Sequence, residues 1–285
     1  MKTFRLESSI KDVKTFNFWQ SLVAEFLGTF ILVFVGFGTA YNNMNPVKLG
    51  LGFGLAGAVA IVCIGPISGA HINPAVSCGL LVARQISLIR YIFYTIFQII
   101  GATAGFGLIS GVSSGEVLYK SYYKINFTSS PSLGEARIDE VIHRVTNPYL
   151  KIICELVITF VLVFTVMRLC VEKRRSPTEK GIAPLFIGLS ITAGVYCGMN
   201  ISGGSMNPAA SLGKYFFKGG TTIMTHIIGP LLGGALAGVS QQMFFTSDLS
   251  MSHIKSYLFD SEFEDHSDNY EPSSSRHDHV LSDNL

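Results

Sequence analysis

Charged residues are scarce in this chain. Only 14% of its 285 residues are Asp, Glu, Lys or Arg, whereas hydrophobic residues make up 48%. Soluble globular domains carry roughly 25% charged residues, so the deficit argues for a chain that crosses a membrane several times. The net charge of +2 is too small to indicate a nucleic-acid partner.

Cysteine motifs and catalytic motifs are also lacking. The five cysteines fall within or at the edges of apolar segments, and no C-x-x-C spacing occurs among them. Metal sites and disulfide scaffolds depend on clustered or regularly spaced cysteines, so we expect no metal, no cofactor and no disulfide framework. No nucleophile paired with a base stands out, and we therefore expect that the protein is not an enzyme.

Long apolar segments, by contrast, recur along the whole chain. A helix that crosses a bilayer needs about 20 predominantly apolar residues. Six segments approach this length, at about 19–41, 49–65, 91–109, 149–171, 182–196 and 222–245. We therefore expect an all-α membrane protein with six transmembrane helices. Two further apolar stretches, 74–83 and 208–217, are too short to cross and are predicted to be re-entrant half-helices.

Each short stretch begins with the same tripeptide. Asn73-Pro74-Ala75 opens the first and Asn207-Pro208-Ala209 opens the second. Asn is a preferred N-cap and Pro is favoured at the first helical position, so each copy predicts an extended segment that leads into a helix. Non-helical backbone at membrane depth is tolerated only where it faces protein or a water-filled cavity. The two motifs therefore predict such a cavity.

The two halves of the chain resemble each other beyond these motifs. Glu25-Phe26-Leu27-Gly28-Thr29-Phe30 parallels Glu155-Leu156-Val157-Ile158-Thr159-Phe160, and Gly101-x-x-x-Gly105 parallels Gly229-x-x-x-Gly233. Matches in the same order indicate an internal duplication. Each copy holds an odd number of spans, so the second copy must be inverted in the membrane. The half-helices would then enter from opposite faces and meet near the midplane, as in inverted-repeat transporters.

The chain divides into a channel domain and two polar ends. The channel domain covers 19–245, with one repeat at about 19–111 and the other at about 149–245. The N-terminal arm, 1–18, is basic, whereas the tail, 246–285, is rich in Ser, Asp and His. The composition of the tail is typical of disordered segments.

Basic residues near the span ends predict the orientation. Lys and Arg are concentrated in the N-terminal arm and in the run Lys173–Lys180, so the positive-inside rule places both termini in the cytoplasm, in a plasma membrane by our expectation. The loop between the repeats then lies outside, where the Asn-x-Thr sequon at Asn126 is a candidate for glycosylation. Ser176 follows Arg174-Arg175 and is a candidate for phosphorylation on a cytoplasmic loop.

Two helix N-termini that meet at one point would place two positive dipole ends together, each about half a charge. With their side-chain oxygens used as caps, Asn73 and Asn207 would have their NH2 groups free to donate to a passing water or hydroxyl. The same field would repel cations and hydronium. For either motif taken alone, the alternative is an ordinary capped helix.

These motifs resemble those of the aquaporins, the major intrinsic protein family. The resemblance covers about 19–245 and is carried by the paired Asn-Pro-Ala motifs, the segment 24–30 and the segment 68–76. It implies a six-helix bundle with two half-helices, one pore per protomer and a homotetramer surrounded by membrane lipids. It also implies that Glu25 and Glu155, which are costly in lipid, bond to the backbone of the re-entrant loops.

The resemblance further identifies four positions of the family's outer constriction. An ungapped count from the motifs assigns them to Phe53, Val195, Gly204 and Ala210. In strict water channels of the family the second position is His and the fourth is Arg, so small or apolar residues replace polar ones here. We expect a wider, less polar constriction that passes glycerol or urea as well as water. Ser211, however, follows the water-channel pattern.

The missing Arg leaves alternatives open. One is a non-conducting or ion-leaking cell-contact member of the same family, and a less favoured one is a secondary transporter. Lys214 lies one helical turn after Ala210 on the same face, so its ammonium could reach the outer vestibule and replace the lost charge. The competing interpretation is a lysine that faces solvent or headgroups. His71, beside the first motif, is a candidate for pH gating.

Overall fold

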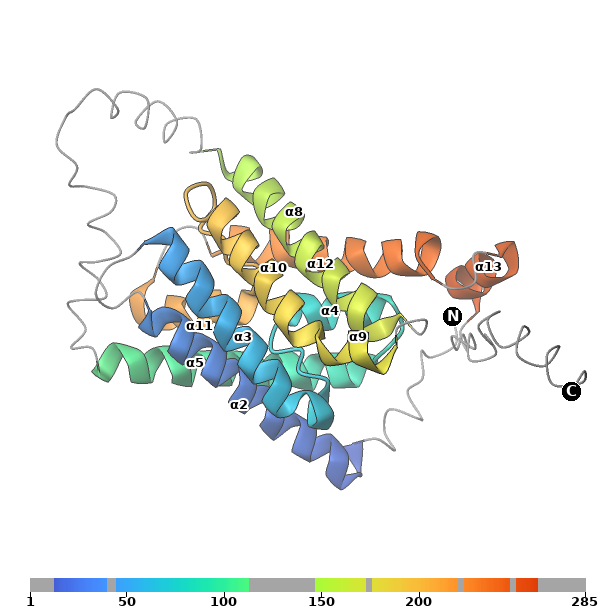
Figure 1. Ribbon diagram of the computed structural model, residues 1–285, viewed down its shortest axis with the longest axis horizontal. Coiled ribbons are helices and arrows are strands. Elements are labelled where there is room, and N and C mark those ends of the chain that lie inside the picture. The colour runs from blue at the N-terminus through green and yellow to red at the C-terminus, as the bar shows by residue number, and fades with distance from the viewer. Residues whose placement is uncertain are drawn as a thin grey trace, which may run out of the picture.

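The computed structural model describes residues 13–39, 45–112, 147–172, 176–219, 223–246 and 250–260, and all regular structure within these ranges is helical. The first half of the chain forms Phe16–Gly38 (α2), Pro46–Ser68 (α3), Pro74–Val82 (α4) and Leu88–Val112 (α5) (Figure 1). The second half forms Pro148–Val166 (α8), its π-helical continuation Met167–Val171 (η1), Pro177–Gly181 (α9), Ala183–Gly198 (α10), Pro208–Lys218 (α11) and Thr225–Phe244 (α12). The prediction of an all-α architecture is confirmed.

Five of these helices are long and apolar enough to cross a membrane: α2, α3, α5, α8 with η1, and α12. The sixth predicted span corresponds to α10, which is apolar but has only 16 residues. At about 1.5 Å per residue it is roughly 24 Å long, short of the hydrocarbon thickness of about 30 Å. A proline at its start fixes where it begins, and the short helix α9 directly precedes it.

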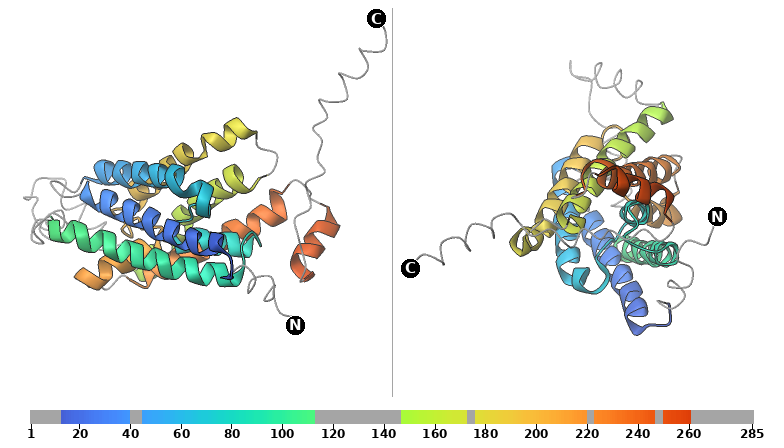
Figure 2. Two further views of the ribbon diagram at one scale, coloured as in Figure 1. Left: turned by 90° about the horizontal axis from the view of Figure 1, so that it is seen from below. Right: turned by 90° about the vertical axis from the view of Figure 1, so that its right-hand side faces the viewer.

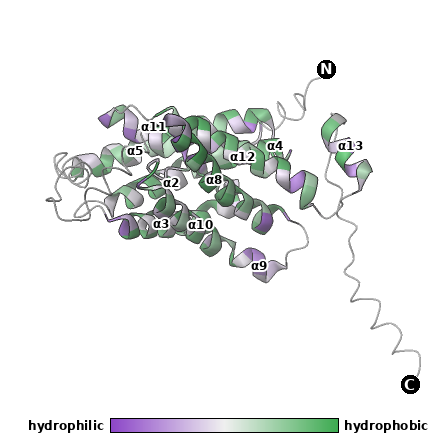
Figure 3. Cartoon of the chain, turned by 90° about the horizontal axis from the view of Figure 1, so that it is seen from above, coloured by the Kyte–Doolittle hydropathy of each residue, from purple (hydrophilic) through white to green (hydrophobic). Residues whose placement is uncertain are grey.

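Large apolar side chains cover the outside of the bundle. Leu55, Val59, Leu189 and Leu232 are each at least 49% exposed although they lie in the interior of apolar helices. Figure 3 shows hydrophobic residues along the helices of the bundle, whereas α9 is largely hydrophilic. Soluble monomers rarely expose continuous apolar surface of this extent, so this surface is suited to lipid or to neighbouring subunits.

Small residues let the long helices approach closely. A Cβ added at Gly101 would collide with the carbonyl oxygen of Phe26, and one added at Gly233 would collide with that of Leu156. The two contacts join α2 to α5 and α8 to α12, so the same packing occurs in each half of the chain. Close approach at small residues is the usual basis of helix association in membranes.

The half-helices interlock the two halves. α4 belongs to the first half but packs on α12, whereas α11 belongs to the second half and packs on α5. Glycines again make the contacts possible, because a Cβ at Gly79 would lie 2.8 Å from the carbonyl oxygen of Gly234, and one at Gly213 would lie 2.8 Å from that of Ala102. The interior of the bundle is therefore shared between the repeats.

The tail contains a helix that the sequence analysis did not predict. Met251–Phe259 (α13) is capped by Ser250, and its Tyr257 hydroxyl donates to the Val82 carbonyl at 3.1 Å. The Arg84 guanidinium lies over the Tyr257 ring, 5.6 Å from its centroid. Within the tail that was expected to be disordered, residues 251–259 thus form a helix whose His253 and Tyr257, on one face, are both buried.

Figure 2 shows that α13 lies toward the same end of the bundle as the start of α2. Residues 1–12 and 261–285 lie outside the described residues, as does Asn126, so the predictions made for them are unchanged.

Candidate functional site

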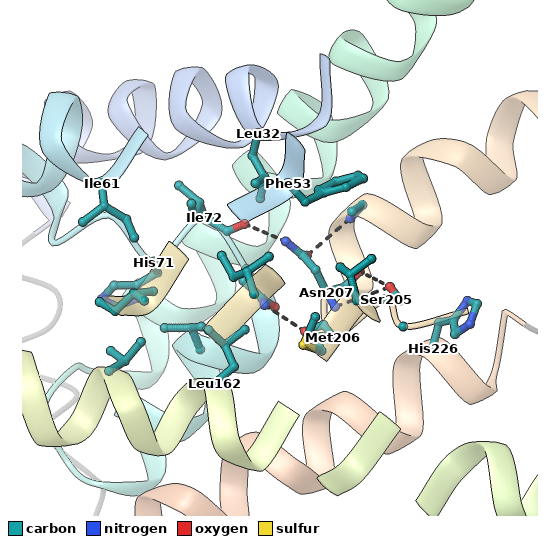
Figure 4. A pocket seen from close by; sticks show the side chains of 18 of the residues that line it. Leu32, Phe53, Ile61, His71, Ile72, Leu162, Ser205, Met206, Asn207 and His226 are labelled. Carbon is teal, nitrogen blue, oxygen red and sulfur yellow. Dashed lines mark hydrogen bonds between the residues drawn. The ribbon is translucent and has the colours of Figure 1, made fainter. Parts of the chain in front are cut away.

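The two Asn-Pro-Ala motifs meet inside the bundle. The Asn73 side-chain amide donates to the Met206 carbonyl at 2.8 Å, and the Asn207 amide donates to the Ile72 carbonyl at 2.9 Å. Each asparagine thus bonds to the residue that precedes the other one, and Figure 4 shows Asn207 with Ile72 and Met206 close to it. The N-termini of α4 and α11 consequently face each other.

The same asparagines cap the half-helices. Asn73 Oδ1 accepts from the Ala75 N–H at 2.8 Å, and Asn207 Oδ1 accepts from the N–H groups of Ala209 at 3.0 Å and Ala210 at 3.3 Å. Pro74 and Pro208 occupy the first turn of each helix. An asparagine NH2 group has two hydrogens. One is used on the opposite loop, so each amide retains one N–H for the cavity rather than two.

Glu25 braces the first re-entrant loop. Its carboxylate accepts from Ser68 Oγ at 2.7 Å, from the N–H groups of His71 at 2.9 Å and Ile72 at 2.7 Å, and from Gln98 Nε2 at 2.8 Å. The side chain is fully buried. A buried carboxylate is tolerated only when its oxygens are satisfied, and here four donors from three segments satisfy it.

Glu155 braces the second loop in the corresponding way. It accepts from Ser202 Oγ at 2.7 Å and from the N–H groups of Ser205 at 3.0 Å and Met206 at 2.8 Å. His226 Nε2 lies 3.8 Å from its Oε1. Both acids therefore bond to the re-entrant loops as the resemblance implied.

The braces hold a strained backbone. Ile72 and Met206, directly before each capping asparagine, adopt positive φ angles of 46° and 51°. This left-handed conformation is costly for residues other than glycine and persists only where the surroundings over-determine it. The carboxylates of Glu25 and Glu155 bind the N–H groups of these same two residues, which accounts for the conformation.

A cavity lies beside the two motifs and is lined by residues of both halves. It offers about 100 Å³ to the centres of water-sized molecules, and a single water needs about 10–15 Å³ of such volume. The four positions predicted for the outer constriction all border it, namely Phe53, Val195, Gly204 and Ala210. Asn73, Asn207, Lys214 and His71 border it as well.

Gly204 does not simply leave empty space in this cavity. Its φ angle is +61°, and a Cβ built on it would lie 3.0 Å from both Cα and the carbonyl oxygen of Val195. The missing side chain therefore lets the loop lie against α10. The close contact between the loop and α10 therefore occupies part of the space that a glycine was expected to add to the cavity.

His226 is a lining residue that the sequence analysis did not single out. It lies on α12, and its Nε2 is 2.7 Å from the Ser202 carbonyl oxygen. The internal duplication could have pointed to this residue. His226 precedes Gly229 by three residues, as Gln98 precedes Gly101 in the first half, and both side chains lie beside the acid of their own repeat.

At the other end of the cavity, His71 Nδ1 is 3.0 Å from Ser77 Oγ, and its ring packs edge-on against Tyr94. Within the described residues, no group of three or more His, Cys, Asp or Glu side chains is placed to hold a metal ion.

Apolar helices surround a narrow cavity in which the N-termini of two half-helices, one from each repeat, face each other. That arrangement defines a membrane channel built from an inverted repeat. The chain belongs to the major intrinsic protein family, whose model matches residues 12–240. The predicted family is thereby confirmed.

Known relatives and a solved structure agree with this assignment. The chain is 34% identical to aquaporin-4 of Mus musculus over 252 residues, which cover 85% of this chain and 72% of the relative. It is 32% identical to aquaporin-5 of Sus scrofa, covering 85% of this chain and 87% of the relative. The X-ray structure of the aquaglyceroporin from Plasmodium falciparum shares the fold, with a TM-score of 0.64 and 23% identity over 79% of this chain and 95% of that chain.

Proposed function

We propose that the protein is a passive channel for water and for small uncharged solutes such as glycerol or urea. The observation that carries the proposal is the pair of opposed N-caps, Asn73 and Asn207, bonded to each other's loops beside a cavity with room for several waters. A hydroxyl that passes between them can accept from the remaining N–H of each amide. The two helix dipoles disfavour cations at the same point.

The constriction residues support a solute range wider than water. Phe53 supplies an aromatic wall, held edge-on against Phe37 with ring centroids 5.0 Å apart. Val195 and Ala210 supply apolar walls where strict water channels of the family carry His and Arg. Without those fixed donors, water gains no special advantage over a polyol, whose carbon atoms suit apolar walls.

Lys214 is the proposed substitute for the missing positive charge. It lies in the last turns of α11 and borders the same cavity as Ala210. A fixed ammonium there adds to the dipole barrier against cations. Lys214→Ala is expected to raise cation current while leaving water flux unchanged. An unchanged current in Lys214→Ala would assign cation exclusion to the helix dipoles alone.

Two other functions compete with this one. A secondary transporter needs ion-coupling groups, but the carboxylates of Glu25 and Glu155 are occupied by loop donors. A non-conducting cell-contact protein has no need of a cavity inside the bundle lined by both half-helices. Passive conduction uses every feature described.

The proposed setting is a homotetramer in the plasma membrane with both termini in the cytoplasm. The exposed apolar surface of the bundle is suited to lipid and to other subunits. On the cytoplasmic side, Ser176 is exposed and caps α9, with its backbone N–H bonded to Glu179. Its hydroxyl is thus accessible to a kinase. Glycosylation is proposed for Asn126 on the outer side.

The direct test is swelling of oocytes that express the protein, measured for water, glycerol and urea, with a current recording on the same cells. We expect flux of all three solutes above that of uninjected cells, without saturation at low solute concentration. Surface labelling should verify equal delivery to the membrane. A protein that reaches the surface yet conducts none of the three would overturn the proposal and favour the cell-contact role.

A further inference from the structure

His226 and Gln98 occupy equivalent positions in the two repeats, but their surroundings differ. Gln98 donates to Glu25 Oε2 at 2.8 Å and is fully buried. His226 instead places its Nε2 2.7 Å from the Ser202 carbonyl oxygen and 3.8 Å from Glu155 Oε1. Its ring also borders the cavity. The second repeat therefore has an aromatic ring of the cavity wall where the first has an internal brace.

The ring lies against the loop that carries the outer constriction. A Cβ built at Gly203 would lie 3.1 Å from His226 Nε2 and 3.3 Å from Cε1, and Gly203 itself has a φ angle of +109°. Gly203, which has no side chain, thus leaves the room that the imidazole fills. In Figure 4, His226 approaches this loop from α12, on the side of Ser205.

The ring adds a polar side chain to a constriction whose four predicted residues have none. Because the partner of Nε2 is a carbonyl oxygen, Nε2 carries the hydrogen, and in the neutral ring Nδ1 remains an acceptor. The charged groups that act on the ring are Glu155 and Lys151 of α8 and Lys214 of α11. The imidazole thus lies beside the acid that braces the loop, within reach of the charge of the lysine that borders the cavity.

We propose that His226 is a specificity-determining residue of the pore, a fifth wall of the outer constriction supplied by α12. The inference rests on the proposed function, because it presupposes conduction. It assigns to one imidazole the bulk and polarity that Val195, Gly204 and Ala210 do not supply. The ring sets the size of the largest solute that passes. Its hydrogen bond to the Ser202 carbonyl holds the loop in the position that defines this size.

The test compares the permeability of water, glycerol and the four-carbon polyol erythritol in oocytes. Shortening the side chain in His226→Ala or His226→Asn should open the wall and raise the erythritol-to-water ratio by about tenfold, the discrimination that roughly one methylene of pocket space provides. His226→Gln keeps a donor and much of the length, so it should stay close to wild type. Surface labelling normalises each value.

The matched control is Gln98→Ala, which removes the equivalent brace in the first repeat. A purely structural role for His226 predicts that both alanine variants lower surface abundance and that neither changes the permeability ratio. An unchanged ratio in His226→Asn and His226→Ala, with a conducting wild type, would overturn the inference and leave the proposed function intact. A wild type that conducts nothing would overturn the proposed function itself and this inference with it.

Discussion

At the scale of single residues, the selectivity proposed for this channel depends on the side chains that border the cavity at the four predicted constriction positions and at His226. Ala210 is the position where the contrast with strict water channels is greatest. It is buried, its N–H bonds to Asn207 Oδ1, and its side chain borders the cavity. A longer side chain at this position would have to extend along the cavity.

Ala210→Arg should therefore narrow the constriction and restore a fixed cation. We expect glycerol flux to fall by about tenfold or more relative to water, with cation current also reduced. Ala210→Leu is the matched control, since it adds bulk without charge and should lower glycerol flux only. Equal glycerol-to-water ratios in wild type and both variants would show that Ala210 does not line the limiting part of the pore. The ratio is measured in the swelling assay.

The residue scale is also where sequence reasoning succeeded and failed most clearly. The caps by Asn73 and Asn207 followed from local rules, because an N-cap followed by proline determines its own hydrogen bonds. The shape of the constriction could not be predicted from such local rules. The room at Gly204 depends on how closely α10 approaches, and the part played by His226 depends on a contact with Ser202 that joins two elements. Contacts of this kind have no local signature.

At the scale of elements, glycines determine how closely the long helices pack. Gly101 is fully buried against the backbone of α2, whereas Gly111, on the same helix, has nothing within 4 Å of its added Cβ. Five of the six spans were predictable from apolar length alone, whereas the sixth, α10, is apolar but shorter than a full crossing. The helix α13 was not predictable, because a segment of polar composition becomes ordered here through Tyr257 and its contacts with Arg84 and the Val82 carbonyl.

Gly101→Ala should push α5 away from α2, because the added methyl group collides with the Phe26 carbonyl. Overpacking of this kind costs about 1–3 kcal/mol, and we expect a lower melting temperature of the detergent-purified protein and less protein at the cell surface. Gly111→Ala is the matched control in the same helix and should be neutral or slightly stabilising. Similar melting temperatures for the two variants would contradict the described packing.

Tyr257→Phe should loosen α13 from the bundle by about 1 kcal/mol, the net value of one hydrogen bond. Trypsin cleavage after Lys255 should become faster, and an unchanged rate would show that the hydroxyl does not hold the helix. Burial raises the pKa of the Tyr257 phenol, while the Arg84 charge opposes that rise. The bond is thus fully present below the unfolded pKa of about 10 and is lost as pH rises through the higher folded value.

At the scale of the whole molecule, the orientation in the membrane can be tested with glycosylation. The chain carries two sequons, one at Asn126 and one at Asn200-Ile201-Ser202. If the loop between the repeats lies outside, Asn126→Gln should abolish a shift in gel mobility on treatment with an endoglycosidase. Asn200→Gln is the matched control and should leave the shift intact, because the Ser202 hydroxyl of that sequon is buried on Glu155 at 2.7 Å. A shift absent from wild type, or retained in Asn126→Gln, would refute external glycosylation at Asn126.

The interlocking of the repeats has a consequence for biosynthesis. The first half-helix, α4, rests on α12, the last helix of the bundle to be synthesised, with Gly79 against the Gly234 carbonyl. Until that last helix has left the ribosome and entered the bilayer, α4 lacks the helix against which Gly79 packs. The first half-helix must therefore remain incompletely packed through most of translation. In any chain that stops before Thr225, it would stay so.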